Sequence, residues 1–194
     1  MSRYRGPKLK IVRRLGELPG LTQKISNKKN PPGQHGKQTK KPSPYAIRLL
    51  EKQKLKYNYG ITEKKLYSYL KKARRNKNST TQVLLQLLEM RLDNILYRAG
   101  ITPTISAARQ LINHDHILVN NQKMSIASYH CEVNDIITYN KKNQKYKFKK
   151  STLIPSFLQI DELRNCLIVK NVISRSQILL KIDELLIIEF YSKN

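Results

Sequence analysis

The strongest structural signal in this chain is the segment LLQLLEMRLDNILYRAG, residues 84–100. Apolar residues recur in it at alternating steps of three and four, which places them on one stripe of an α-helix. They are Leu85, Leu88, Leu92, Ile95 and Ala99. Gly100 follows at the position where a glycine commonly ends a helix. The spacing therefore predicts one continuous helix that begins after Thr81 and packs this stripe against a core.

The neighbouring row of the same predicted helix becomes polar toward its end, where it contains Arg91, Asn94 and Arg98. A guanidinium group donates hydrogen bonds in a planar fork that matches phosphate oxygens. We therefore expect the helix to pack on one side and to present these three side chains beside the core.

A second helix and a small sheet are predicted directly after this segment. Thr104 is placed to start the helix, and Arg109 is expected to project from the side opposite its packing residues. β-branched runs at 117–119 and 136–139 then predict strands, with Asn120-Asn121 as the turn after the first strand. Two helices and a small sheet, with arginines on the helices, favour a compact RNA-binding unit.

The charge of the chain points to a polyanionic partner. Its 194 residues include 38 Lys and Arg against 13 Asp and Glu, a formal net charge of +25. Residues 1–78 alone hold 23 of these cations and three of the acids. Such a surface attracts nucleic acid or an anionic membrane. No run of about 18 apolar residues occurs, so we do not expect a membrane span.

The N-terminal part combines loops with two predicted helices. Prolines and glycines crowd residues 19–44 and predict a loop, and those nearer the start disfavour a long helix there. Ser43 and the following proline predict a helix over about 45–57. Thr62 is placed to cap a further helix over about 63–75.

Lysines and tyrosines alternate between these two helices, from Lys52 to Lys65. Amines bind phosphates, and tyrosine rings stack on bases or ribose. The alternative is a solvated face with the tyrosines in the core, and this second interpretation is the stronger one for the run taken alone.

Two further segments carry structural signals. Residues 141–150 alternate lysines with Tyr146 and Phe148, which predicts a ribbon with one cationic face. Residues 179–191 are strongly apolar, and Asp183 favours a helix there over a strand. Their apolar side chains are expected to pack on this protein's own core or on a neighbour.

Catalytic and metal-binding patterns are missing from the sequence. Gly33 to Lys37 lacks the spacing of a nucleotide-binding P-loop and is better interpreted as a turn that carries a lysine toward a phosphate. His114 and His116 have no third ligand at usable spacing. The two cysteines are expected to be buried small apolar residues. We therefore expect no enzyme activity, no cofactor and no metal.

Three segments carry a resemblance to a known family. They are RLDNILYRAG at 91–100, AARQLINH at 107–114 and ILVN at 117–120. They closely resemble the RNA-binding domain of the small ribosomal subunit protein S-four family, a domain that other RNA-binding modules share. Further similar segments extend the resemblance over nearly the whole chain, in order. They are MSRYRGP at 1–7, RRLG at 13–16, PGQHG at 32–36, EKQKLK at 51–56 and DELLIIEFYS at 183–192.

An α+β architecture follows from these patterns and from the resemblance. We expect a basic, extended or loop-rich N-terminal segment at 1–44 and a helical domain at 45–88 with the C-terminal segment 179–194 packed near it. A compact helix-helix-β RNA-binding domain with a small antiparallel sheet is expected at 89–152. Residues 153–178 match the family poorly and are left unassigned.

The resemblance also implies a function. The chain would be a structural constituent of the small ribosomal subunit that binds the five-prime domain of the ribosomal RNA as a primary binder and nucleates assembly of the subunit body. It would contribute to translational accuracy with small-subunit proteins five and twelve and contact messenger RNA where it enters the subunit. Some bacterial members carry four zinc-binding cysteines near the N-terminus, and this chain has none there.

The expected binding residues follow from the basic segments and the family motifs. The expected rRNA-binding residues are Arg3, Arg5, Arg13, Arg14, His35, Lys37, Arg48, Lys52, Lys54, Lys56, Tyr57, Arg91, Asn94, Arg98, Arg109, His114 and Lys123. Phosphate would repel the acids of the C-terminal segment, which favours a basic protein partner for Glu184, Glu189 and Tyr191. The resemblance implies that this partner is small-subunit protein five.

Two alternatives have different functional classes. An RNA-modifying enzyme with this domain appended would need a catalytic domain, for which residues 1–88 are too basic and 150–194 too short. A free RNA chaperone or translational repressor can coexist with a ribosomal role. The segment LLQLLEM at 84–90 looks most like that of a plastid-encoded member of the family, and heavy use of Lys, Asn, Ile and Tyr suits an AT-rich organelle genome. The resemblance therefore implies the chloroplast stroma, with the bacterial cytoplasm as the alternative.

Overall fold

A computed structural model of the chain describes residues 4–28, 30–34, 36, 41–140 and 154–192. The chain forms two compact units, one from Met1–Thr81 with Leu179–Asn194 and one from Gln82–Ile178. The helices of the first unit are α1 (Lys8–Leu15), α2 (Pro44–Asn58), α3 (Glu63–Arg74) and α7 (Glu184–Ser192). The remaining elements are α4 (Thr80–Glu89), α5 (Leu92–Arg98), α6 (Ile105–Asn113), β1 (Ile117–Val119), β2 (Gln122–Lys123), β3 (Ile136–Tyr139), β4 (Leu158–Asp161), β5 (Cys166–Val169) and the 3-10 helix η2 (Arg175–Gln177).

Side-chain caps begin three of the predicted helices. The hydroxyl oxygens of Ser43, Thr62 and Thr104 each accept a hydrogen bond from the backbone N–H three residues later, at 3.2, 3.4 and 3.3 Å. Each bond satisfies one of the N–H groups that lack a partner inside the helix. The predicted starts of α2, α3 and α6 are therefore confirmed.

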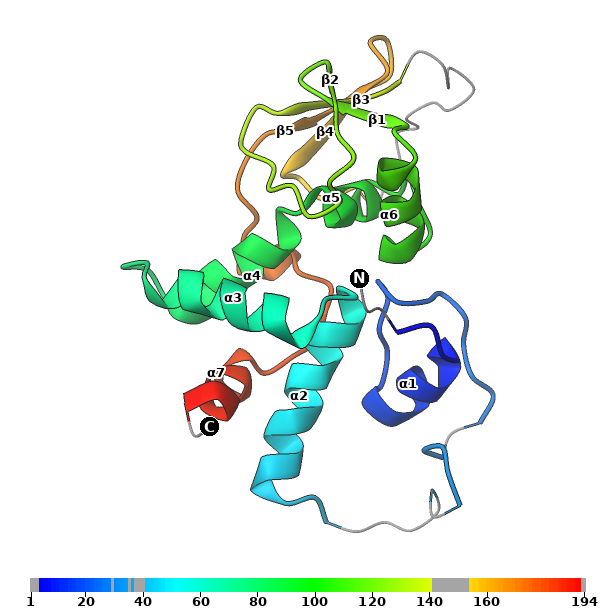
Figure 1. Cartoon of the computed structure of the whole chain (residues 1–194), viewed down its shortest axis with the longest axis vertical. Helices are drawn as coiled ribbons and strands as arrows, with labels where there is room; N and C mark the ends of the chain where they lie inside the picture. Colours follow the sequence, from blue (N-terminus) through cyan, green and yellow to red (C-terminus); the bar gives the residue numbers. More distant parts are fainter. Residues whose placement is uncertain (1–3, 29, 35, 37–40, 141–153, 193–194) are drawn as a thin grey trace. The chain divides into compact units, whose positions relative to one another are not determined.

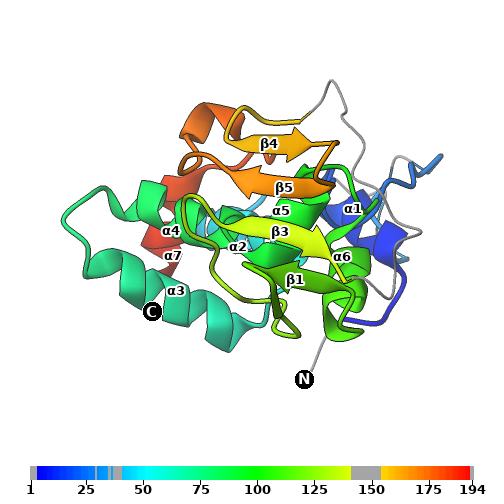
Figure 2. The same ribbon diagram turned by 90° about the horizontal axis from the view of Figure 1, so that it is seen from above.

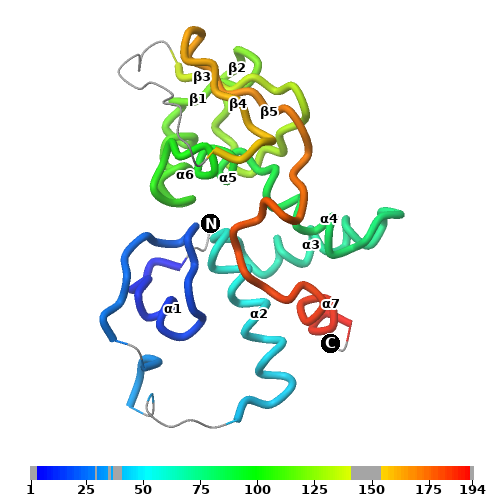
Figure 3. The backbone as a smooth tube through the Cα atoms, turned by 180° about the vertical axis from the view of Figure 1, so that it is seen from behind, coloured from blue at the N-terminus to red at the C-terminus, as the bar shows by residue number. Residues whose placement is uncertain are grey.

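The first unit is built around α2. Figures 1 and 3, drawn from opposite sides, both show α7 lying alongside α2, and these two helices are in contact. Leu55 of α2 and Ile187 of α7 are fully buried. The predicted C-terminal helix is thus confirmed. An additional short helix, α1, was not expected; it begins after Pro7 and buries Leu15.

The predicted continuous helix over 82–99 is wrong, because the chain leaves the helix at Met90 and Arg91. The carbonyl of Met90 accepts a hydrogen bond from Cys131 N–H at 2.9 Å, and the Leu92 N–H donates to Tyr129 at 2.9 Å. A loop some 40 residues further along the chain thereby bridges the break. All five stripe residues remain buried, on α4 and α5 and at the residue that ends α5.

The second unit packs α5 and α6 against one face of an antiparallel sheet of order β2-β1-β3-β5-β4. Figure 2 shows β4, β5, β3 and β1 lying side by side. The α+β class and the small antiparallel sheet are confirmed. Residues 158–169, which the sequence patterns leave unassigned, supply β4 and β5 and so belong to this unit.

Register across the sheet explains its core. Ile137 is paired with both Val119 and Leu167, and Val169 is paired with Leu158. All five side chains are buried in the same cluster as the apolar residues of α5 and α6. Asn120 and Asn121 have φ values of 50° and 64°, as their predicted turn requires.

The basic ribbon predicted at 141–150 lies outside the described residues. Within the described helices, none combines the length and apolar character that crossing a membrane requires.

Candidate nucleic-acid interface

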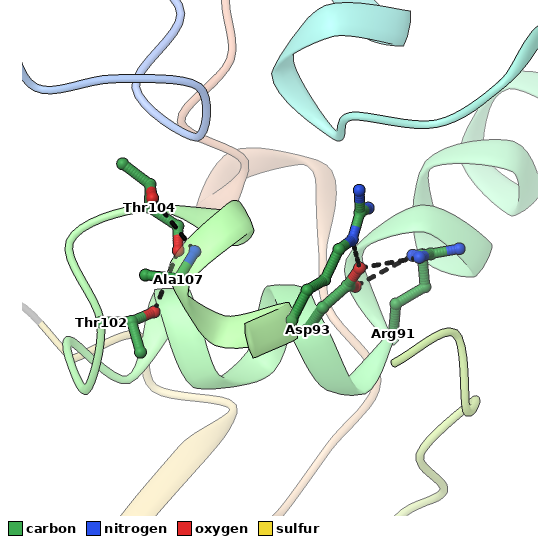
Figure 4. A network of polar contacts seen from close by, with 6 residues as sticks. Arg91, Asp93, Thr102, Thr104 and Ala107 are labelled. Carbon is green, nitrogen blue, oxygen red and sulfur yellow. Dashed lines mark hydrogen bonds and ion pairs between the residues drawn. The ribbon is translucent and has the colours of Figure 1, made fainter. Parts of the chain in front are cut away.

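Asp93, in the first turn of α5, joins two of the predicted phosphate-binding arginines. Arg91 donates through Nε and Nη2 to the two carboxylate oxygens at 3.0 and 2.7 Å. Arg109 reaches the same carboxylate from α6, with Nε 2.6 Å from Oδ2. Figure 4 shows Arg91 and Asp93 facing each other. Asp93 is 0% exposed and both arginines are buried.

A second buried carboxylate, Glu89 at the end of α4, contacts the other two predicted residues. The Asn94 amide donates to Glu89 Oε2 at 2.6 Å, and Arg98 Nε lies 3.6 Å from the same oxygen. Arg98 also donates through Nη2 to the carbonyl of Gln177. Asn94 and Arg98 are both buried.

The prediction that these four side chains project from the helices is therefore wrong. A guanidinium group loses hydration when it is buried, so it requires a carboxylate beside it, and Asp93 and Glu89 supply that charge. Both acids stand next to the arginines in the sequence. Residues 79–100 contain two acids, Glu89 and Asp93, and two cations, Arg91 and Arg98. This equal number of opposite charges was the signal that could have predicted internal ion pairs.

Cations of α2 are also engaged within the protein. Lys52 is 6% exposed, and its Nζ lies 3.0 Å from Glu63 Oε1 and 4.3 Å from the centre of the Phe190 ring. Lys56 Nζ lies 3.7 Å from the second Glu63 oxygen. The interpretation of this run as a phosphate-binding surface is contradicted for Lys52, whose ammonium group is internal. The alternative, a solvated face with the tyrosines in the core, also fails for Lys52, but it agrees with the exposed Lys64 and Lys65 and the buried Tyr59.

Arg48 and Lys54 have carboxylate partners as well. Arg48 Nε lies 2.7 Å from Oε2 of Glu189, which belongs to α7. Lys54 Nζ lies 2.5 Å from Glu51 one turn earlier on α2. Both ion pairs are partly exposed. Because each cation lies beside a carboxylate, its charge is partly neutralised within the first unit.

The C-terminal residues expected to meet another protein have partners in their own unit. Glu189 pairs with Arg48 while its side chain remains 47% exposed. The Tyr191 hydroxyl donates to Glu63 Oε1, and burial together with this hydrogen bond raises the pKa of Tyr191. Glu184 is half-buried in the first turn of α7. Glu189 thus has an internal partner and a partly exposed side chain, and its contact with protein five stays a prediction.

Glu63 is the point where α2, α3 and α7 meet. Burial raises the pKa of its carboxyl, but the hydrogen bonds from Tyr191 and Lys52 and the positive charges of Lys52 and Lys56 outweigh burial. The net result is a pKa below the ordinary value of 4.5. Glu63 is therefore a carboxylate that stabilises the docking of α7 near neutral pH.

Several predicted residues do lie on the surface. Arg5 and Arg14 of the N-terminal segment and His114 and Lys123 of the second unit are exposed. Arg13 instead donates to the carbonyls of the loop at 30–31. Tyr57 is half-buried, with its ring 5.5 Å from that of Tyr4. Predicted contacts at Arg3, His35 and Lys37 lie outside the described residues.

Within the described residues, a strongly basic exposed segment was not among the predicted rRNA-binding residues, although Lys64 and Lys65 belong to the lysine–tyrosine run. It runs along α3 and the turn after it, and residues 64–77 contain no acid. Its exposed cations are Lys64, Lys65, Lys71, Lys72, Arg74, Arg75 and Lys77. The density of cations without acids was the signal that could have identified it.

Chemically reactive groups are scarce in the described residues. Cys131 and Cys166 are buried, as predicted, and burial raises the pKa of both thiols. They therefore remain protonated and poorly nucleophilic near neutral pH. Across the described ranges, no group of three or more His, Cys, Asp or Glu side chains is placed to hold a metal ion.

Comparison with known proteins covers the whole chain. The family described as "Ribosomal protein S4/S9 N-terminal domain" matches residues 3–89, and the "S4 domain" matches residues 90–137. The chain is 53% identical over 201 residues to "Small ribosomal subunit protein uS4c" of Cyanophora paradoxa, covering 100% of both chains.

Two other relatives show the same extent. The identity is 53% over 200 residues to "Small ribosomal subunit protein uS4" of Nostoc punctiforme and 54% over 212 residues to "Small ribosomal subunit protein uS4c" of Prototheca wickerhamii. Each match covers 100% of this chain and 99% of the relative. An identity this high over full length, joined to the S4 domain that contains the buried arginine network, shows the family. This chain belongs to the uS4 family of ribosomal proteins.

Proposed function

We propose that this protein is a structural, rRNA-binding component of the small ribosomal subunit and has no enzyme activity. The full-length similarity to relatives named small ribosomal subunit proteins is the observation that carries the proposal. The net charge of +25 supports it, because cations that neutralise phosphates release condensed counterions and so drive binding.

The proposed RNA contacts come from exposed groups of both units. Arg5, Arg14, His114 and Lys123 are exposed and can reach phosphate or sugar oxygens. The buried arginines act differently: Arg91 and Arg109 pair with Asp93 and tie α5 to α6, and Arg98 pairs with Glu89 at the end of α4. Their contribution to RNA binding is thus indirect: they stabilise the packing of the helices that carry the surface of the S4 domain.

The finer role follows the family resemblance. The chain acts as a primary binder of the five-prime domain of the small-subunit RNA, nucleates assembly of the subunit body, and adjusts translational accuracy together with small-subunit proteins five and twelve. It also contacts messenger RNA where it enters the subunit. The outer side of α7, where the half-buried Glu184 lies beside the exposed Leu185, is the surface proposed for protein five.

The proposed location is the chloroplast ribosome, with the bacterial cytoplasm as the alternative. Relatives named uS4c, the chloroplast type, and relatives named uS4 from cyanobacteria are about equally similar to this chain.

Direct RNA binding tests this proposal. The purified chain is titrated into transcripts of the five-prime and three-prime domains of the small-subunit RNA, at the same salt concentration and without other proteins. We expect at least tenfold tighter binding to the five-prime domain, since specific complexes commonly exceed non-specific ones by ~10³ or more. Equal affinity for both transcripts would show that the protein is not a primary binder of the five-prime domain.

A further inference from the structure

The outer face of α3 concentrates positive charge without compensation. Seven cations occupy residues 64–77, all are exposed, and the segment contains no acid. Glu63, the acid at the start of α3, is engaged by Lys52 and Tyr191 from the neighbouring helices. Among the ion pairs of the described residues, none includes any of the seven cations.

The orientation of this face is fixed by packing. Leu66, Leu70 and Ala73 are 0% exposed on the opposite side of α3, and Tyr69 is buried with them. The helix therefore cannot rotate to redistribute its charges. Residues 64 and 71 are seven positions apart and so lie on the same side, two turns and about 10 Å along the axis.

Two tyrosine rings restrict two of these lysine side chains. Lys71 Nζ lies 4.9 Å from the centre of the Tyr67 ring, and Lys65 Nζ lies 5.2 Å from that of Tyr69. Tyr67 is itself 43% exposed on the outer face. A cation near an aromatic face is weakly attracted to it, which restricts a side chain that is otherwise flexible.

The exposed cations of this segment repel one another, which favours binding of an anionic ligand. Lys71 and Arg75 are four residues apart, and Lys71–Arg74 and Lys72–Arg75 are three apart, so like charges are neighbours on the surface. The helix dipole favours cations in the last turn, but it does not account for Lys64 and Lys65 in the first turn. A bound polyanion would remove this repulsion.

We propose that the outer face of α3 together with the turn after it, from Lys64 to Lys77, is a binding surface for the RNA backbone. It lies in the first unit, which does not contain the S4 domain. The inference rests on the proposed function. It adds a second protein surface, which contacts RNA phosphates other than those bound by the S4 domain. RNA fits better than an anionic membrane, because a helix that lies in a membrane inserts its apolar face, and the apolar face of α3 is already buried in the protein.

The salt dependence of binding provides a test with a matched control. The variant Lys71→Gln/Arg75→Gln removes two charges from one side of α3, and glutamine retains helix propensity. The control Lys170→Gln/Lys181→Gln removes two exposed charges elsewhere. Both full-length variants are titrated with the five-prime domain transcript over a series of salt concentrations, and far-UV circular dichroism verifies the helix content.

Each lost phosphate contact changes the slope of log K against log salt by about 0.7 for a single strand and about 0.9 for a duplex. The α3 variant is expected to show a slope shallower by about 1.4–1.8 and an affinity roughly tenfold or more lower at about 0.1 M salt. The affinity of the control variant is expected to stay within about twofold of that of the unmodified chain. Because repulsion is relieved, the Tm of the free α3 variant is expected to be equal to or higher than that of the unmodified chain.

Equal slopes for the α3 variant and the unmodified chain would overturn the inference. The same loss in both double variants would also overturn it, since net charge alone would then explain the effect. If the unmodified chain did not prefer the five-prime domain, the proposed function would fail instead, and the two failures are thus distinguishable.

Discussion

Asp93 accepts hydrogen bonds from two guanidinium groups and is completely enclosed by the second unit. One carboxylate shared by Arg91 and Arg109 ties the start of α5 to α6. Burying three charged groups removes their hydration, so the cluster is stable only while every member has its partner. The same logic explains why its arginines are poor candidates for direct phosphate binding.

Removing the charge of Asp93 should therefore strongly destabilise the second unit. Asp93→Asn keeps the size of the side chain but leaves two buried arginines without a carboxylate, which should cost about 3–5 kcal/mol of unfolding free energy. Urea denaturation measures the loss. The matched control is Asp161→Asn, which breaks the exposed pair with Arg164 and should cost less than about 1 kcal/mol. Similar small losses for both would show that the buried network contributes little.

At the scale of elements, local signals predicted most of the helices. Ser43, Thr62 and Thr104 each cap a helix within reach of their own neighbours, so no distant part of the chain is needed to recognise them. The break at Met90 could not be predicted in this way. Its backbone groups bond to residues 129 and 131, and the apolar stripe continues across it without a change of period.

The candidate site was harder to predict than the fold, for a related reason. Sequence spacing shows that Arg91 and Arg98 share a helix face, but it does not show whether that face is covered. Exposure of the α3 cations, in contrast, follows from local composition, because α3 has no acid beyond Glu63 to pair with them.

The contact between α7 and α2 makes a prediction about single apolar residues. Ile187 is 0% exposed and Leu185 is 67% exposed on the same helix. Ile187→Ala should lower the unfolding free energy by about 2–5 kcal/mol, while Leu185→Ala should change it by less than about 0.5 kcal/mol. Urea denaturation of both variants tests this. Equal effects would mean that α7 docks through a different face.

Acid should weaken the same helix contact through Glu63. Its pKa is lowered in the folded protein, so it binds a proton less readily there than in the unfolded chain. The stability that it contributes is present above its ordinary pKa of 4.5 and is lost as the pH falls through the lower folded value. The urea midpoint of the unmodified chain should therefore fall as the pH is lowered below 4.5.

Glu63→Gln should be less stable than the unmodified chain at neutral pH and should lose less stability over this acidic range. Glu17→Gln, at an exposed acid of the first unit, should leave the pH dependence unchanged. If the Glu63 variant followed the pH profile of the unmodified chain, Glu63 would not be the group that titrates.

For the whole molecule, most of the buried and half-buried acids are paired with cations. Glu51, Glu63, Glu89, Asp93 and Glu189 all pair with cations of the same unit. These pairs cancel charge locally and leave the net charge of +25 unchanged, so the excess positive charge is carried by the other cations. A positive excess this large suits a long phosphate backbone better than a small anion.

The division into two units predicts that residues 82–178 fold alone. Seventeen buried apolar residues, all within these limits, form a single core cluster. A fragment 82–178 should unfold cooperatively in urea, whereas a fragment 79–194 should expose the buried face of α7, which normally covers α2. The measurement is urea denaturation together with limited proteolysis of the two fragments. In the longer fragment, the protease is expected to digest residues 179–194 rapidly. If these residues were as well protected as residues 82–178, the division into two units would be contradicted.

Sedimentation of the endogenous protein tests the central claim most directly. Cell or organelle extract is separated on a sucrose gradient at low and at moderate salt, and the protein is quantified against small-subunit RNA in each fraction. The account predicts one copy per small-subunit RNA, with no appreciable pool of unbound protein and none on isolated large subunits. A predominantly unbound protein, or one that sediments with other RNAs in preference to the small subunit, would contradict it.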